Sequence, residues 1–99
     1  MITCVRSWAV QPGKLPEGIV VLKEIAALAK KLSGLDVTIT TSIGGNLSDV
    51  SLAYQVESLA VYDEKLAQIY AHPELPPLVA RLAAIALPNS GHERLYRHV

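Results

Sequence analysis

Two neighbouring segments of the chain alternate between apolar and polar residues, and this alternation predicts a pair of β-strands. In residues 35–43 and 50–57, most alternate positions carry an apolar side chain, as in strands with one buried face. Gly44, Gly45 and Asn46 lie between them and tolerate the positive φ values of a tight turn. The pattern therefore predicts an antiparallel hairpin. A phosphate-binding loop is excluded, because a helix would have to follow the glycines.

A different period marks the helices. Residues 15–32 repeat apolar side chains every three or four positions, which predicts an amphipathic helix. A second such stripe follows Ser58, a favourable N-cap, and extends from residue 59 to about residue 71. Pro73 disfavours helical geometry at the residue before it. We therefore expect this second helix to be split there and to resume at Pro76 and Pro77.

Strands are also expected at the two ends of the sequence, over residues 2–11 and 92–99. The order is then strand, helix, strand, strand, split helix, strand. This is the ferredoxin-like βαββαβ arrangement, an α+β fold in which a four-stranded antiparallel sheet carries its helices on one face. The 99 residues are expected to form one domain, residues 1–99.

The alternation also assigns side chains to the two faces of this sheet. The helix side is expected to receive Val37, Ile39, Leu52, Tyr54, Val56, Leu95 and Val99. The open side is expected to receive Thr38, Thr40, Ser42, Ala53, Gln55, Glu57, His92, Arg94, Tyr96 and His98. In the first strand, we expect Val5 and Ala9 toward the helices and Arg6 and Trp8 on the open side, although Ile2 and Cys4 favour the reverse.

The composition predicts a subunit interface and argues against several classes of partner. Hydrophobic residues make up 51% of the chain, more than a small monomer readily buries, which indicates a subunit interface. Nine basic and nine acidic residues give no net charge, so no nucleic-acid or membrane partner is expected. The single cysteine, Cys4, excludes an internal disulfide and a cysteine-based zinc site, and we expect it to be buried and inert. We expect no metal site.

The N-terminal residues show no signal-peptide pattern, because Arg6 interrupts them and no apolar core follows. No apolar run approaches the roughly 18 residues that a membrane helix requires. A soluble protein of the cytoplasm is therefore expected.

Three segments carry a resemblance to a known family: VQPGKLPEGIVVLKEIAALAKK, ESLAVYDEKL and HPELPPLVARLA. Together with the closing strand, they resemble the dimeric α/β-barrel proteins of the NIPSNAP-like kind over nearly the whole chain. The resemblance implies a homodimer in which two ferredoxin-like subunits pack sheet to sheet. It also implies relatives such as cofactor-independent monooxygenases of quinol-like aromatics, haem-degrading oxygenases, lactone isomerases and polyketide cyclases.

The haem-degrading members have an asparagine on the first strand and a helical histidine that ligates iron. This chain has no asparagine there, and His72 precedes a proline at the expected helix break. We therefore expect no cofactor, and we expect His72 to be a helix-end residue. Tyr62 and Tyr70 lie on the apolar stripe and are expected in the core.

The open face supplies the candidate site residues. His92 is a candidate base, and Arg94 and Tyr96 are candidates for holding an anionic oxygen, so these three are the expected catalytic residues. Four further residues are expected to bind ligand: Arg6, Trp8, Gln55 and Glu57. The structural alternatives are packing for Trp8 and ion pairs with Glu57 or Glu93 for the arginines.

Three functions are compatible with this face. The first is a cofactor-independent monooxygenase, isomerase or cyclase acting on an oxygenated aromatic or polyketide-like compound. The second is a module that binds such a ligand without chemistry. The third is a homo-oligomeric assembly module. An enclosed pocket that contains both Trp8 and His92 would favour the first, and a pocket without a poised base would favour the second.

Overall fold

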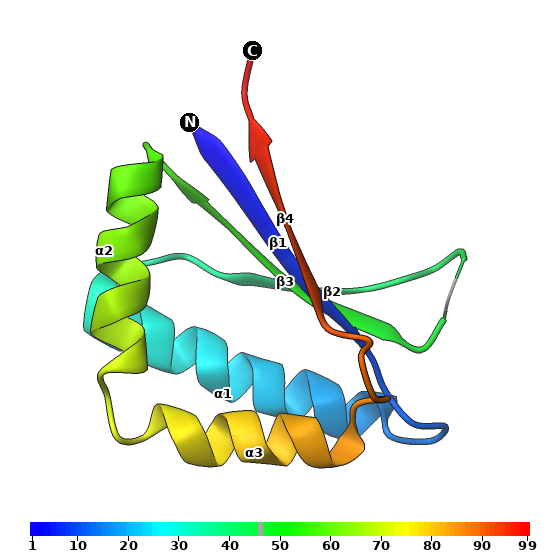
Figure 1. Ribbon diagram of the computed structural model, residues 1–99. Coiled ribbons are helices and arrows are strands. Elements are labelled where there is room, and N and C mark those ends of the chain that lie inside the picture. The colour runs from blue at the N-terminus through cyan, green and yellow to red at the C-terminus, as the bar shows by residue number, and fades with distance from the viewer. Residues whose placement is uncertain (46) are drawn as a thin grey trace.

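The computed structural model describes residues 1–45 and 47–99 and contains the elements that the sequence predicts (Figure 1). They follow in the order β1 (Ile2–Ala9), α1 (Leu15–Ser33), β2 (Thr38–Thr41), β3 (Asp49–Val56), α2 (Leu59–Tyr70), α3 (Leu75–Ile85) and β4 (His92–Arg97). Over the described residues, the strands form a four-stranded antiparallel sheet in the order β2-β3-β1-β4. The expected ferredoxin-like α+β fold is confirmed.

Local capping explains where the helices begin and end. Gly34 closes α1 in the left-handed conformation, with φ of 75°, and its N–H donates to the Lys30 carbonyl at 3.0 Å. The Ser58 hydroxyl accepts a hydrogen bond from the N–H of Val61 at 3.2 Å and thereby caps α2. A short turn around Pro73 separates α2 from α3, so the predicted split of the second helix is confirmed.

The hairpin is present, but its first strand is shorter than the sequence predicts. β2 pairs with β3 only from Thr38 to Thr41, whereas the alternation covers residues 35–43. Gly45 adopts a positive φ of 68°, as expected for the turn. The prediction for Asn46 falls outside the described residues. Alternation therefore overestimates this strand, because it reports side-chain facing and not backbone pairing.

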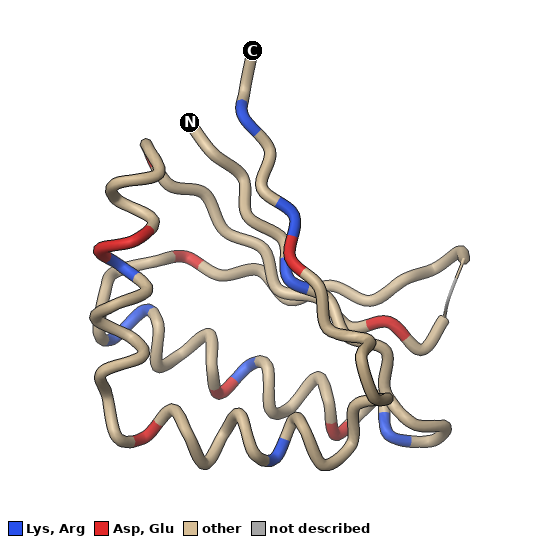
Figure 2. The backbone as a smooth tube through the Cα atoms, viewed as in Figure 1, with Lys and Arg blue, Asp and Glu red and all other residues tan. Residues whose placement is uncertain are grey.

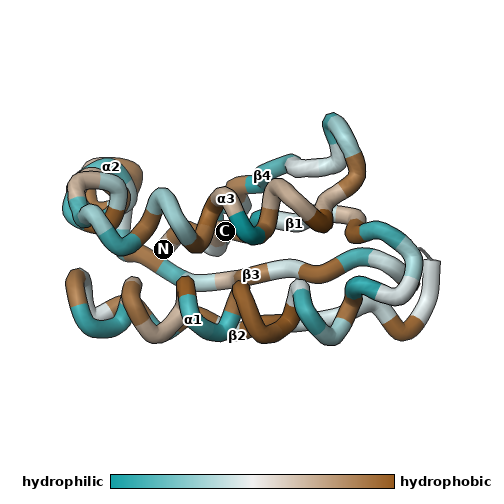
Figure 3. The backbone as a smooth tube through the Cα atoms, turned by 90° about the horizontal axis from the view of Figure 1, so that it is seen from below, coloured by the Kyte–Doolittle hydropathy of each residue, from teal (hydrophilic) through white to brown (hydrophobic). Residues whose placement is uncertain are grey.

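All three helices of the described chain lie on one face of the sheet, and α1 and α3 are neighbours on that face (Figures 1 and 3). Apolar residues recur along both of these helices, with hydrophilic residues between them (Figure 3). The buried core includes Leu22, Val21 and Val50 together with Cys4, which is fully buried as expected. None of the described helices is long and apolar enough to span a bilayer.

Charged residues of both signs are interspersed along the chain (Figure 2). Several of them form ion pairs at the surface. The Lys30 ammonium lies 2.7 Å from the Asp36 carboxylate, and Arg81 of α3 pairs with Glu24 of α1. The second pair links the two helices at their exposed sides, where such contacts are worth little stability.

The first strand faces the opposite way from the expectation. In the register of the sheet, Cys4 lies opposite Tyr54, and Arg6 lies opposite Leu52. Residues directly opposite in an antiparallel pair share a face, so Ile2, Cys4, Arg6 and Trp8 face the helices. Burial of Ile2 and Cys4 in the core sets this orientation. The expectation that Val5 and Ala9 face the helices, and that Arg6 and Trp8 face outward, is therefore wrong.

Candidate functional site: a cavity between the sheet and the helices

A cavity of about 480 Å³ lies between the sheet and the helices. Its lining is almost entirely apolar: Leu52 comes from the sheet, Ile25 and Ala29 from α1, Ile69 from α2, and Leu82 from α3. This volume and this apolar character are typical of sites for small molecules.

The position of α3 explains why space remains there. This helix packs chiefly on α1 and not on the sheet. Its end is fixed to the end of β1 by backbone hydrogen bonds, from Gln11 N–H to the Ile85 carbonyl and from Leu87 N–H to the Ala9 carbonyl, each at 2.8 Å. The segment after α3, including Pro88 and Asn89, then lines one part of the cavity. The cavity is therefore bounded by chain segments that are anchored at both ends.

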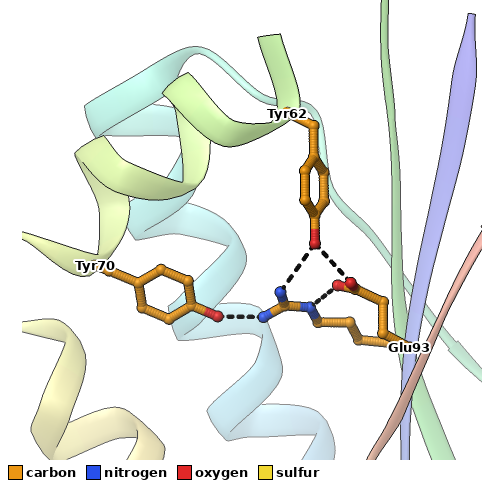
Figure 4. Close-up of polar contacts among 4 residues, drawn as sticks. Tyr62, Tyr70 and Glu93 are labelled. Carbon is orange, nitrogen blue, oxygen red and sulfur yellow. Dashed lines mark hydrogen bonds and ion pairs between the residues drawn. The ribbon is translucent and has the colours of Figure 1, made fainter. Parts of the chain in front are cut away.

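Arg6 and Tyr70 line the cavity and belong to a cluster of four polar residues that also includes Tyr62 and Glu93 (Figure 4). The Arg6 guanidinium donates through Nε to the Glu93 carboxylate and through Nη1 to the Tyr70 hydroxyl. The Tyr62 hydroxyl accepts from Arg6 Nη2 at 3.4 Å and donates to Glu93 Oε1 at 2.6 Å. The Arg6 guanidinium also lies 5.8 Å from the centre of the Tyr70 ring. Each charge in this cluster therefore has several partners.

Hydrogen bonding fixes the charge states of the cluster. Burial alone would lower the pKa of Arg6, but its hydrogen bonds to Tyr70, Glu93 and Tyr62 outweigh this effect and raise the pKa. Burial alone would raise the pKa of Glu93, but hydrogen bonds from Tyr62 and Arg6 outweigh it and lower the pKa. Burial and the bond to Glu93 raise the pKa of Tyr62. At neutral pH, the cluster thus contains an Arg6–Glu93 ion pair and a neutral Tyr62.

Tyr54 lines the cavity, and its buried hydroxyl is without a hydrogen-bond partner among the described residues. The Cys4 thiol is its neighbour: interaction with Tyr54 lowers the pKa of Cys4 but does not outweigh burial. Burial raises the pKa values of Tyr54 and Cys4, so both groups stay protonated at neutral pH. A buried hydroxyl without a partner costs about 1–3 kcal/mol, which a water or ligand that reached it could recover.

Trp8 lines the same cavity and packs tightly against the backbone after α3. A Cβ atom at Gly91 would lie 2.9 Å from both Cδ1 and Nε1 of the indole ring. Only glycine allows the ring and the chain to approach this closely. Trp8 is therefore a wall of the cavity that is held in place by the β4 connection.

The remaining predicted site residues are not at this cavity. His92, Arg94 and Tyr96 are exposed residues of β4, and they share the open face with Ser7, Val5 and Thr3 opposite them. His92 Nδ1 lies 3.2 Å from the Ser90 carbonyl, and on the same face Ser7 and Ser51 share a hydrogen bond of 2.7 Å. The cavity that Trp8 lines does not include His92 in its lining.

Gln55 and Glu57 line a second, more polar hollow near the end of β3, which Asp36 and Lys65 also border. His72 lies at the end of α2, where its Nδ1 accepts from the N–H of Glu74 at 3.2 Å, as expected for a helix-end residue. The described residues contain no group of three or more histidines, cysteines or carboxylates placed to hold a metal ion.

Sequence reasoning missed Tyr62, Tyr70 and Glu93 as site residues. The two tyrosines were expected in the core, but Tyr70 is 53% exposed and both use their hydroxyls at Arg6. The alternative of an Arg6–Glu93 ion pair is confirmed, within one chain. The sequence signal that could have found them is the pair of apolar residues Ile2 and Cys4. If these two residues face the helices, Arg6 on the same face of the strand does so too, and a buried arginine needs polar partners.

No protein-family model matches the chain. No curated protein matches it either. Many solved structures are similar over nearly the full length, and three of them illustrate the range. A NIPSNAP domain protein from Burkholderia xenovorans is 14% identical, with 100% of this chain and 95% of that chain covered and a TM-score of 0.84. A NIPSNAP family protein from Agrobacterium tumefaciens is 20% identical, with 99% and 92% covered and a TM-score of 0.82.

The third structure is a mutant of SnoaB, a cofactor-independent oxygenase from Streptomyces nogalater. It is 19% identical, with 98% of this chain and 91% of that chain covered and a TM-score of 0.68. At such identities the likeness concerns the fold and not the chemistry. The chain thus has the ferredoxin-like fold that is found in NIPSNAP proteins and in SnoaB.

Proposed function

We propose that this protein binds a small, largely apolar molecule in the cavity between the sheet and the helices. The observation that carries the proposal is the cavity of about 480 Å³, apolar over most of its wall, with Arg6 and Tyr70 at one place in its lining. An apolar volume with a few convergent polar groups binds the body of a ligand by burial and orients its polar end.

The lining supports binding without chemistry. Among the described residues that line the cavity there is no histidine, aspartate or glutamate to act as a general base. Tyr54 is held in its protonated form by burial. The cavity is a pocket without a poised base, and this favours a ligand-binding module over an enzyme at this place.

An enzyme acting at the open face is the second candidate function. His92 contacts the Ser90 carbonyl through Nδ1, and the tautomer that donates from Nδ1 leaves the lone pair of Nε2 available on the face that also carries Arg94 and Tyr96. This candidate is supported by the similarity of fold to a cofactor-independent oxygenase. This candidate requires a second subunit to enclose the substrate, and it fails if His92→Ala leaves turnover of oxygenated aromatic compounds unchanged.

The fluorescence of Trp8 tests the cavity directly, because Trp8 is the single tryptophan of the chain. Titration with heptyl methyl ketone is expected to change this fluorescence with saturation. Ala29→Phe fills part of the cavity and should weaken binding at least about tenfold, the order of effect of losing burial of a few CH₂ groups. Ala27→Phe makes the same change at an exposed position of α1 and should leave binding unchanged. Absence of saturable binding, or equal effects of the two variants, would overturn the proposal.

We also propose that two copies of the chain associate through the open face of the sheet. This face carries small or short side chains at its centre, including Val5, Ser7 and Ala53, and no described helix covers it. Such a surface suits packing of one sheet on another. Light scattering should give twice the mass of one chain. Val5→Asp should give the single-chain mass, whereas Val20→Asp, on the exposed side of α1, should not.

A further inference from the structure

Arg6 is the charged residue among the described residues that line the cavity. An arginine in an apolar cavity ordinarily selects a carboxylate, because its planar fork donates two parallel hydrogen bonds to the two oxygens. The ligand class therefore depends on whether the guanidinium of Arg6 is available to a ligand.

Glu93 already occupies this arginine. One carboxylate oxygen accepts from Arg6 Nε, and the other accepts from the Tyr62 hydroxyl at 2.6 Å. Only 24% of the Arg6 side chain and 28% of the Glu93 side chain are exposed. In such a partly buried position, charges interact more strongly than in water. The cluster therefore presents no net charge, and a second carboxylate at Arg6 would be repelled by Glu93.

Hydrogen-bond donors remain unused on Arg6 and Tyr70, the two residues of the cluster that line the cavity. Tyr70 accepts from Arg6 through its oxygen, so its own hydrogen is not used by that bond. Two of the five N–H donors of Arg6 are also not used by its bonds to Glu93, Tyr70 and Tyr62. Such donors match a carbonyl or hydroxyl oxygen of an uncharged molecule.

We propose that Glu93 is a specificity-determining residue that makes the cavity prefer an uncharged ligand, with a carbonyl or hydroxyl oxygen at its polar end, over a carboxylate of the same shape. Glu93 acts through Arg6 and does not touch the ligand itself. It discriminates by placing a like charge against the competing ligand. The inference rests on the proposed binding function of the cavity.

Two probes with the same heptyl tail test this selectivity, heptyl methyl ketone and octanoate, titrated against Trp8 fluorescence near neutral pH. The native protein should bind the ketone at least about tenfold more tightly than octanoate, as expected for an unfavourable charge. Glu93→Gln frees the charge of Arg6 and keeps a side chain of the same size. It should increase octanoate affinity about tenfold to a hundredfold and change ketone affinity little.

Two control variants separate this effect from a general disturbance. Glu64→Gln makes the same change of charge at an exposed position of α2 and should leave the ratio of the two affinities as in the native protein. The double variant Arg6→Met with Glu93→Gln should lose the gain in octanoate affinity. If circular dichroism shows that Glu93→Gln does not fold, Glu93→Ser replaces it, and the ratio in the native protein still decides the question.

The outcomes distinguish the two proposals. If the native protein binds octanoate as tightly as the ketone, or if the ratio is the same in Glu93→Gln, the cavity still binds ligand but the role of Glu93 is overturned. If neither probe changes Trp8 fluorescence in any variant, the binding function itself is overturned, and the inference with it.

Discussion

On the face of the sheet that the helices cover, four polar side chains form one network, whereas on the open face the polar side chains form separate contacts, such as the Ser7–Ser51 pair. Arg6 and Glu93 belong to β1 and β4, yet both meet tyrosines of α2. On the open face, His92 contacts the carbonyl of Ser90, only two residues away. Burial accounts for the difference, because a charge removed from water must be paired, while an exposed one is solvated.

The covered face is the one that can discriminate between ligands. A polar group that is fixed by several partners has one geometry and one charge state, so it can select a ligand. Exposed groups on β4 acquire such an environment only if another surface covers them. The covered face is therefore a site within one chain, and the open face would become one only in an assembly.

The largest difference between the faces is expected for loss of an apolar side chain. Leu52 is buried on the covered face, and Leu52→Ala should lower the free energy of unfolding by about 2–4 kcal/mol. Gln55→Ala, on the open side of the same strand, should change it by less than about 0.5 kcal/mol. Urea denaturation measures both. Similar losses from the two substitutions would show that the open face is as well packed as the covered one.

The next effect concerns the ion pair of the covered face. A double-mutant cycle of Arg6→Met and Glu93→Gln should give a coupling free energy of about 1–3 kcal/mol, because the two groups share a network and are about three-quarters buried. The same cycle on the exposed pair of Arg81 and Glu24 should give about 0.2–1 kcal/mol. Equal couplings would contradict the view that burial strengthens the first pair.

A smaller effect is expected at the contact that holds Trp8 on the covered face. Gly91→Ala places a methyl group 2.9 Å from the indole ring, so the ring must move, and the expected loss is about 1–2 kcal/mol. The fluorescence maximum of Trp8 should shift as well. Gly44→Ala meets no atom within 4 Å and is the control. An unaltered fluorescence spectrum in Gly91→Ala would place Trp8 elsewhere.

The smallest effect is the pH dependence of the same ion pair. The folded-state pKa of Glu93 lies below its ordinary value of 4.5, since hydrogen bonds from Tyr62 and Arg6 outweigh the opposing effect of burial. On acidification, the unfolded chain therefore takes up this proton first. The stability that Glu93 contributes is present above pH 4.5 and is lost as the pH falls through its lower, folded-state pKa.

The difference in unfolding free energy between the native protein and Glu93→Gln should accordingly shrink as the pH falls from 7 toward 3. In Arg6→Met, where the carboxylate has lost its cation, the pH-dependent loss should be smaller. A difference that stays constant over this range would show that Glu93 has the same pKa in the folded and unfolded chain.

The local elements of this protein follow from its sequence alone. The hairpin, the capped start of α2 at Ser58 and the break at Pro73 depend on residues within one turn of each other. Periodicity and capping act over such short distances, so they can be recognised without knowledge of the fold. The ferredoxin-like order follows from these elements, because few topologies accommodate them.

Only the tertiary structure decided the orientation of β1 and the composition of the site. Both faces of β1 carry apolar residues, so its orientation depends on pairing with β3 and β4, which lie far away in the sequence. The partners of Arg6 are 56 to 87 residues distant, and the cavity exists because α3 packs on α1 instead of on the sheet. Contacts of this kind depend on how helices and strands pack against one another. No local pattern of hydrophobic and polar residues encodes this packing.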